Sequence, residues 1–157
     1  MSDIDRPNRY PLPPVMTVAT LGLCYALHVF LPLGWEPEEV TTFARYTGVL
    51  LILIAFGMDI WAALTFRRHR ANIMPHRAAT AVISDGPFAY SRNPIYLANV
   101  LMVAGFGFAL GSRWFFIGAL VLFVLLQELA IKREERHMDA KFGATWRDYA
   151  KAVRRWI

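Results

Sequence analysis

The sequence contains a single cysteine, Cys24, and comparatively few charged residues, 18% of the 157. A lone thiol excludes an internal disulfide and gives no metal-site spacing, so we interpret Cys24, which lies in an apolar run, as a small packing residue. A cleavable secretory signal is not expected, because the first fifteen residues are polar and rich in proline. These shortages exclude a disulfide-stapled scaffold and leave no predicted metal site.

Hydrophobic residues, by contrast, make up 56% of the chain. A soluble domain is usually about half apolar and about a quarter charged, so this composition predicts an integral membrane protein. The length suits one domain, residues 1–157, made of a few spanning helices. A separate soluble catalytic domain does not fit within it, so any activity must be built from the helices and their connections.

Four apolar runs predict an all-α, multi-pass transmembrane helical bundle of about four spans. A helix needs about 20 apolar residues to cross the hydrocarbon core. The runs that approach or exceed this length are Val15–Leu33, Phe43–Phe66, Ile95–Leu110 and Trp114–Ile131. The last two form a helical hairpin around a short turn. The domain therefore divides into a polar leader (1–14), the first two spans (15–66), a cytoplasmic connection (67–94), the helical hairpin (95–131) and a cytoplasmic helical tail (132–157).

The basic residues indicate the orientation. All but two of the 17 lysines and arginines, Arg45 and Arg113, fall in the leader, the connection or the tail. This asymmetry is the positive-inside signal, which predicts that both termini are cytoplasmic, in the inner membrane if the source is bacterial. Anionic headgroups then account for the net charge of +5. The lipid bilayer is the expected partner, and no nucleic acid is expected because no nucleic-acid motif is present.

The tail is expected to be helical in two parts. Helical spacing of glutamates and apolar residues continues the fourth span beyond the membrane as far as Phe142-Gly143, where the glycine ends the helix. Thr145 and Asp148 then form a plausible capping pair for an amphipathic helix that lies in the cytoplasmic interface. Its expected apolar face consists of Trp146, Tyr149, Ala150, Val153 and Trp156. Such a helix serves either as an anchor or as the cover of a site.

A polar, turn-rich segment, residues 85–96, stands immediately before the third apolar run. Two prolines, a glycine and an arginine are costly to place there, so we expect chemistry rather than an ordinary interfacial loop. Arg92 precedes the hairpin and Glu134-Glu135 follow it, which brings them to the same membrane face. An arginine suits a carboxylate and the glutamates suit a cation, which predicts a site for a mixed-charge ligand. Alternatively, Arg92 and a glutamate pair with each other.

The segment from Ser84 to Tyr96, the hydrophobic hairpin, Glu134-Glu135 and part of the tail together resemble the isoprenylcysteine carboxyl methyltransferase and phospholipid methyltransferase superfamily, in particular its small bacterial members. The tail residues that carry the resemblance are Phe142-Gly143, Trp146, Tyr149 and Arg154-Arg155-Trp156. The resemblance covers residues 72–157. It implies a small multi-pass enzyme that binds S-adenosylmethionine near the cytoplasmic surface.

The resemblance also implies roles for individual residues. Arg92 and Glu135 are the expected catalytic residues; Arg92 would take the cofactor carboxylate, and Glu134 or Glu135 would balance positive charge. The residues expected to bind the cofactor are His76, Gly86, Tyr90, Arg92, Asn93, Pro94, Tyr96, Glu134, Glu135 and Tyr149. For His76, a plain surface position is the alternative. Asn93 stands where eukaryotic carboxyl methyltransferases usually have histidine, and it cannot titrate near neutral pH, so a histidine proton switch is not expected here.

The leading functional hypothesis is S-adenosylmethionine-dependent methyl transfer to a carboxylate, amine or thiol of an amphipathic or lipid-soluble acceptor that enters laterally from the bilayer. The alternatives are an NADPH-dependent membrane reductase of the sterol reductase type, for which the turn supplies few basic residues, and a non-catalytic membrane scaffold. Asp59, inside the second span, is expected to face the bundle interior and to pair with Asn99 or an arginine.

Overall fold

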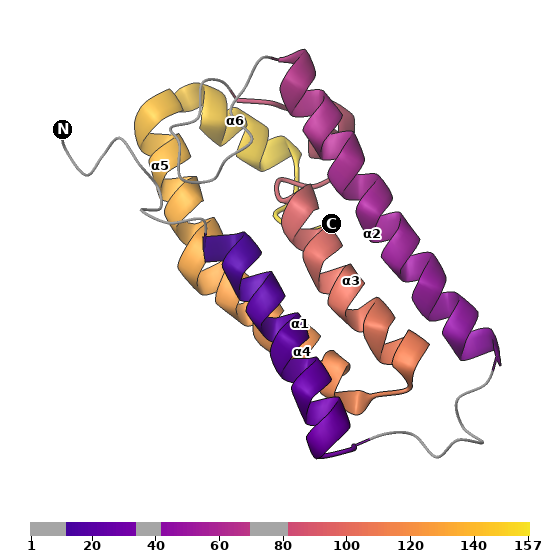
Figure 1. Cartoon of the computed structure of the whole chain (residues 1–157). Helices are drawn as coiled ribbons and strands as arrows, with labels where there is room; N and C mark the ends of the chain where they lie inside the picture. The colour runs from indigo at the N-terminus through magenta and orange to yellow at the C-terminus, as the bar shows by residue number, and fades with distance from the viewer. Residues whose placement is uncertain (1–11, 34–41, 70–81) are drawn as a thin grey trace.

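The computed structural model describes residues 12–33, 42–69 and 82–157, and these residues form helices and their connections without a β-strand (Figure 1). The helices are α1 (Leu12–Phe30), α2 (Thr42–Arg68), α3 (Pro94–Leu110), α4 (Arg113–Leu125), α5 (Lys132–Phe142) and α6 (Ala144–Ala152). A 3₁₀ turn, η2 (Gly86–Ala89), precedes α3, and a π-helical segment, η3 (Leu126–Ile131), joins α4 to α5 without a break.

The prediction of an all-α membrane bundle is confirmed. Three helices are long and apolar enough to cross a membrane, namely α1, α2 and the continuous helix Arg113–Phe142, and α3 is an apolar helix of slightly shorter length. The first span begins earlier than predicted, because Pro13 and Pro14 form the first turn of α1 instead of belonging to an extended leader. Proline is tolerated there, since the first turn of a helix has no acceptor for its backbone N–H groups.

The helices pack as two pairs that are joined through the hairpin. Helix α2 lies along α3, and α1 lies along α4, while α3 and α4 contact each other around the turn at Gly111 (Figure 1). Cys24 of α1 is buried and contacts Gly118 of α4, and its thiol donates a hydrogen bond to the carbonyl of Trp114. The interpretation of Cys24 as a packing residue is therefore confirmed.

The close contact between α2 and α3 depends on two glycines. A Cβ atom at Gly48 would meet the backbone of α3 at Ala109 and, at 2.6 Å, the carbonyl oxygen of Gly105. A Cβ atom at Gly105 would in turn lie 2.9 Å from the carbonyl oxygen of Gly48. Small residues commonly permit such approach between membrane helices. This helix pair positions the segment that follows η2.

Gly48→Ala is therefore expected to destabilise the protein by about 1–3 kcal/mol, because the backbone of α3 must move to admit the new methyl group. Unfolding in detergent, by heat or denaturant, measures the change. Gly57→Ala is the matched control, since a Cβ atom at Gly57 in the same helix meets nothing within 4 Å. Equal stability of the two variants would contradict the proposed role of Gly48.

The fourth span continues beyond the predicted membrane surface as one helix, as predicted, and ends at Phe142 where Gly143 has a positive φ of 54°. The π-helical segment within it was not predicted. A π-turn adds an extra residue to a helical turn and rotates everything that follows relative to the preceding helix. It therefore helps to set the direction in which the glutamates of α5 face.

The prediction for the last helix is wrong in two respects. Helix α6 begins at Ala144 with Gly143 as its N-cap and has no side-chain capping bond, so Thr145 and Asp148 are not a capping pair. It ends at Ala152, because Val153 adopts an extended conformation, and Trp156 therefore lies outside the helix. The aromatic residues of α6, Trp146 and Tyr149, are buried within the protein, so this face covers the end of the bundle and does not face lipid.

Candidate functional site

Three segments meet at one end of the bundle: the loop 91–93 before α3, helix α5, and the last residues of the chain, 153–157 (Figure 1). These five residues follow α6 and are called the C-terminal tail below, in distinction from the predicted helical tail 132–157. The loop and tail are joined by backbone, since the N–H of Arg92 donates to the carbonyl of Arg154 at 3.0 Å. The loop is held on its other side by Tyr149 of α6, whose hydroxyl donates to the carbonyl of Phe88 in η2 at 2.8 Å. Residues distant in sequence are therefore fixed together here.

At the centre of this region, two arginines share one carboxylate. Arg92 Nη1 lies 3.1 Å from Glu135 Oε1, and both side chains are largely buried. Arg155 forms the stronger, two-pronged contact: its Nε donates to Oε1 at 2.9 Å and its Nη2 donates to Oε2 at 2.6 Å. The juxtaposition of Arg92 with the glutamates, predicted from topology, is present in the structure, and so is the ion pair that was its alternative interpretation.

Arg92, Glu135 and Arg155 form an ion cluster in which one buried donor has no partner among the described residues. Arg92 Nε is buried and has no hydrogen-bond partner there, although its guanidinium lies 5.8 Å from the centre of the Trp146 ring. A buried donor without an acceptor is unfavourable, so an anionic group at this position would be stabilised. Hydrogen bonding to Glu135 raises the pKa of Arg155 above its ordinary value, so this second arginine also remains charged.

Asn93 contacts the tail. Its side-chain Nδ2 donates to the carbonyl of Arg155 at 3.0 Å, and its backbone N–H donates to Ser91 Oγ at 3.1 Å. Asn93 is the N-cap of α3, yet its side chain does not cap the helix. Pro94, buried directly after it, begins α3 as a first-turn proline. Asn93 and Pro94 thus fix the loop that carries Arg92.

Tyr96 and Glu134 form a separate buried contact, in which the tyrosine hydroxyl donates to Glu134 Oε1 at 2.6 Å. Tyr96 comes from the first turns of α3 and Glu134 from α5, so the bond ties these two helices together next to Glu135. Among the described residues, the two neighbouring glutamates therefore have different partners: one binds a neutral hydroxyl and the other binds two guanidinium groups.

Tyr149 is a donor at this site. Its ring lies 5.6 Å from that of Trp146, and burial raises the pKa of its hydroxyl to about 12, against the lowering effect of nearby Arg92. The hydroxyl therefore stays protonated at any physiological pH, which suits its bond to the carbonyl of Phe88. Trp146, which sequence reasoning placed on an apolar face and among the residues of the family resemblance but not in the site, is the aromatic wall beside Arg92.

Two predicted cofactor residues, Gly86 and Tyr90, are not part of this cluster. Gly86 has a positive φ of 58° and a Cβ there would meet the side chain of Thr65, so this glycine allows η2 to lie against α2. Tyr90 is 72% exposed and faces Trp61 of α2, with 6.2 Å between ring centres. His76 lies outside the described residues. A cofactor role for these three residues stays a prediction.

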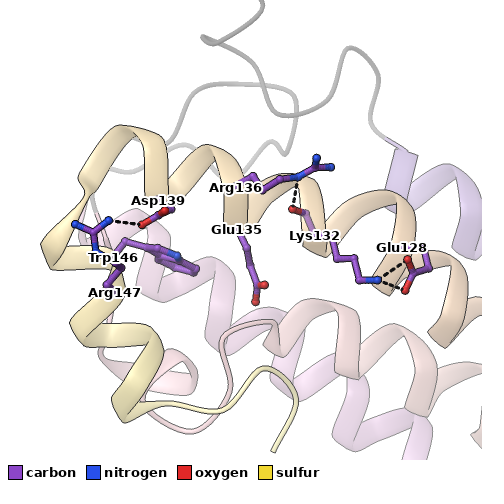
Figure 2. A pocket seen from close by; sticks show the side chains of 7 residues that line it. All are labelled: Glu128, Lys132, Glu135, Arg136, Asp139, Trp146 and Arg147. Atoms are coloured by element: carbon purple, nitrogen blue, oxygen red, sulfur yellow. Dashed lines mark hydrogen bonds and ion pairs between the residues drawn. The ribbon is translucent and has the colours of Figure 1, made fainter.

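An open groove of about 630 Å³ runs along α5 beside the ion cluster (Figure 2). It is lined by Glu128, Lys132, Glu135, Arg136, Asp139, Trp146 and Arg147. Glu135 belongs both to the groove and to the ion cluster, and Figure 2 shows it and Trp146 directed toward the same space from α5 and α6. Most of the other lining residues were missed, although their spacing along one helix face, with charges of both signs, could have identified them.

Within residues 12–33, 42–69 and 82–157, no group of three or more histidine, cysteine, aspartate or glutamate residues is placed to hold a metal ion. Asp59 Oδ1, in α2, is buried without a hydrogen-bond partner in these ranges, so the expected pairing of this oxygen with Asn99 or an arginine is not observed.

Comparison with known proteins identifies related sequences. A protein of Haemophilus influenzae, named only as uncharacterised, is 30% identical over 63 residues, which is 40% of this chain and all of that protein. The nickel-cobalt-cadmium resistance protein NccN of Alcaligenes xylosoxydans xylosoxydans is 24% identical over 74% of this chain. The cobalt-zinc-cadmium resistance protein CzcN of Cupriavidus metallidurans is 23% identical over 77%. The matched regions are 51% and 50% of these two resistance proteins, so the chain spans about half of their length.

The family comparison covers the elements that build the site. The phospholipid methyltransferase family matches residues 43–145, which is more than half of the chain and runs from α2 through the loop of Arg92 to the first residues of α6. The match includes Arg92, Glu134 and Glu135 and stops before the C-terminal tail. The chain belongs to the phospholipid methyltransferase family.

Proposed function

We propose that this membrane protein transfers the methyl group of S-adenosylmethionine to an amphipathic or lipid-soluble acceptor at the cytoplasmic membrane surface. The observation that carries the proposal is the ion cluster of Arg92, Glu135 and Arg155 at the edge of an open groove. Membership of a methyltransferase family supports the reaction class. The cluster supports the cofactor, because it offers separate positions for an anion and a cation.

The side chains present fit the charges of S-adenosylmethionine, which carries a carboxylate, an ammonium and a sulfonium. Arg92 Nε, which has no partner among the residues that the structure describes, is a donor for the carboxylate, and the carboxylate of Glu135 is an acceptor for a cation. Trp146 offers an aromatic face between the ion cluster and the groove. A sulfonium or an adenine ring is stabilised beside such a face.

In methyl transfer, an electron pair of the acceptor forms a bond to the methyl carbon while the bond from that carbon to sulfur breaks, and its electrons pass to sulfur. The task of the protein is therefore to align the two reactants and to exclude water, which supplies much of the acceleration. The loop of Arg92, fixed by Asn93 and the tail, provides that alignment. A carboxylate acceptor needs no proton acceptor, whereas an amine or a thiol must release a proton.

A lipid-soluble acceptor is supported by the surroundings of the loop. Tyr90 and Trp61 form an exposed aromatic pair, and Ile60 and Leu64 of α2 are also exposed beside it. Exposed aromatic residues at the end of an apolar helix are typical of the membrane–water boundary. An acceptor held at the membrane–water boundary would therefore reach the end of the bundle that carries Arg92.

Ligand binding tests the proposal. The protein in detergent is expected to bind S-adenosylhomocysteine and to gain thermal stability from it, because binding to the folded state raises the unfolding temperature. NADPH is expected to have no such effect. Calorimetry and thermal shift measure both, and incubation of the protein and membrane lipids with methyl-labelled cofactor identifies the fraction that gains label. Binding of NADPH in place of S-adenosylhomocysteine would favour a reductase, and binding of neither would favour a scaffold.

A further inference from the structure

Both carboxylate oxygens of Glu135 are already occupied by the protein itself. Arg155 donates to each of them, at 2.9 and 2.6 Å, and Arg92 lies 3.1 Å from Oε1. These contacts use three of the roughly four acceptor positions of a carboxylate, so a ligand cation that binds Glu135 competes with the guanidinium groups. The two arginines differ in how deeply their side chains are buried, and this difference decides which of them leaves.

Arg92 is the more buried of the two. Its side chain is 13% exposed and lies beside Trp146, and its backbone N–H is bonded to the tail. The side chain of Arg155 is 35% exposed, and within the described part of the chain its hydrogen bonds are those to Glu135. When the guanidinium of Arg155 moves away from Glu135, it enters water, where it is already partly solvated. If the guanidinium of Arg92 moved away from Glu135 instead, its charge would lie unpaired in a buried position, which is far more costly.

We propose that Arg155 is an internal substitute for the ligand cation: its guanidinium occupies Glu135 in the free protein and moves aside when the ammonium or sulfonium of S-adenosylmethionine binds there. This inference rests on the proposed function. The exchange keeps the local charge constant, because one cation replaces another. A neutral donor forms a weaker hydrogen bond with Glu135 than a cation does and compensates less for displacing Arg155, so this residue favours positively charged ligands.

The contacts of the tail hold its backbone in place and allow the side chain of Arg155 to rotate. The carbonyl of Arg155 accepts from Asn93 Nδ2 at 3.0 Å and from Ser91 Oγ at 3.4 Å, which fixes the backbone. The next residue, Trp156, stacks on Phe123 at 4.5 Å between ring centres and donates to Gln127. With the backbone held on both sides, rotation of the Arg155 side chain frees Glu135 while the tail stays in place.

Removal of the competing cation tests the inference. Arg155→Ala is expected to bind S-adenosylmethionine about tenfold more tightly than the wild type, because a charge-assisted hydrogen-bond pair no longer has to be broken. Arg155→Lys keeps a cation near Glu135 and is expected to remain within about threefold of the wild type. Lys151→Ala removes an exposed cation that pairs with Asp148 and is expected to leave the affinity unchanged. Calorimetry on the full chain in detergent measures all four proteins.

The outcomes separate this inference from the proposed function. If the wild type binds S-adenosylmethionine but Arg155→Ala binds equally or more weakly at unchanged thermal stability, Arg155 is structural and the inference fails alone. If Lys151→Ala bound S-adenosylmethionine as tightly as Arg155→Ala, the lower net charge would explain the tightening, and the inference would also be overturned. If the wild type does not bind, the proposed function fails first and the inference with it. Should Arg155→Ala unfold, Arg155→Gln, which keeps a neutral donor, replaces it with the same expected tightening.

Discussion

Arg92→Ala is expected to abolish methyl transfer and to weaken the binding of S-adenosylhomocysteine by at least about 100-fold, because it removes the charged donor proposed for the ligand carboxylate. The protein is expected to stay folded, since Glu135 keeps its two hydrogen bonds from Arg155 after the substitution. Calorimetry measures the affinity, and transfer of label to lipid measures the activity. This variant has the largest effect expected of any single substitution.

Glu135→Gln is expected to cause a similar loss of binding, because it removes the carboxylate proposed for the ligand cation. The isosteric amide leaves Arg92 and Arg155 close together without a shared negative charge, so their mutual repulsion is no longer balanced. Thermal stability should therefore fall further than in Arg92→Ala. Lys151→Ala, which removes an exposed cation on α6, is the control and should retain wild-type binding. Undiminished affinity in both Arg92→Ala and Glu135→Gln would remove the site assignment.

The spans could be predicted because they depend on properties that are local in sequence. An apolar run of sufficient length forms a helix wherever it lies in a bilayer, and the runs found for α2 and α3 agree with the observed helices to within two residues at each end. The contact between Arg92 and Glu135 was also accessible, because a helical hairpin returns the chain to the face from which it started. Neither inference required knowledge of side-chain packing.

The parts that sequence reasoning missed depend on contacts between distant residues. Trp146 becomes an aromatic wall only because α6 folds back onto the loop of Arg92, and Trp156, beyond the end of α6, stacks on Phe123. The π-helical segment has no distinctive composition, and Gly48 cannot be distinguished from Gly57 until α3 is placed against one and not the other. Tertiary contacts, which have no local signature, determine each of these features.

Asn93 illustrates the same limit within the site. Its difference from the histidine of eukaryotic carboxyl methyltransferases bears on proton transfer, because an amide does not titrate. In the structure, its side chain instead donates to the carbonyl of Arg155, so its observed contact is with the tail. A residue type alone defines which bonds are available, whereas the fold defines which one is made. The position thus connects the loop of Arg92 to the last residues of the chain.

Truncation after Ala152 is expected to abolish binding of S-adenosylmethionine, although Arg155→Ala strengthens it. The truncated chain loses the two carbonyl groups that accept from Arg92 and Asn93, together with the stack of Trp156 on Phe123 and its bond to Gln127. Hydrogen bonds contribute about 1 kcal/mol each and an aromatic pair about as much, so a stability loss of about 3–4 kcal/mol is expected. Thermal unfolding in detergent measures the loss, and calorimetry measures binding.

Truncation is expected to weaken binding and Arg155→Ala to strengthen it, so the two variants distinguish the role of the tail backbone from that of the Arg155 side chain. Deletion of Ile157 alone is the control for truncation, because this residue is 76% exposed and follows the last of these contacts. It should bind and unfold like the wild type. If the protein truncated after Ala152 still bound the cofactor, the loop of Arg92 would hold its position without the tail. The tail would then only obstruct Glu135, and Arg155→Ala and the truncation would strengthen binding alike.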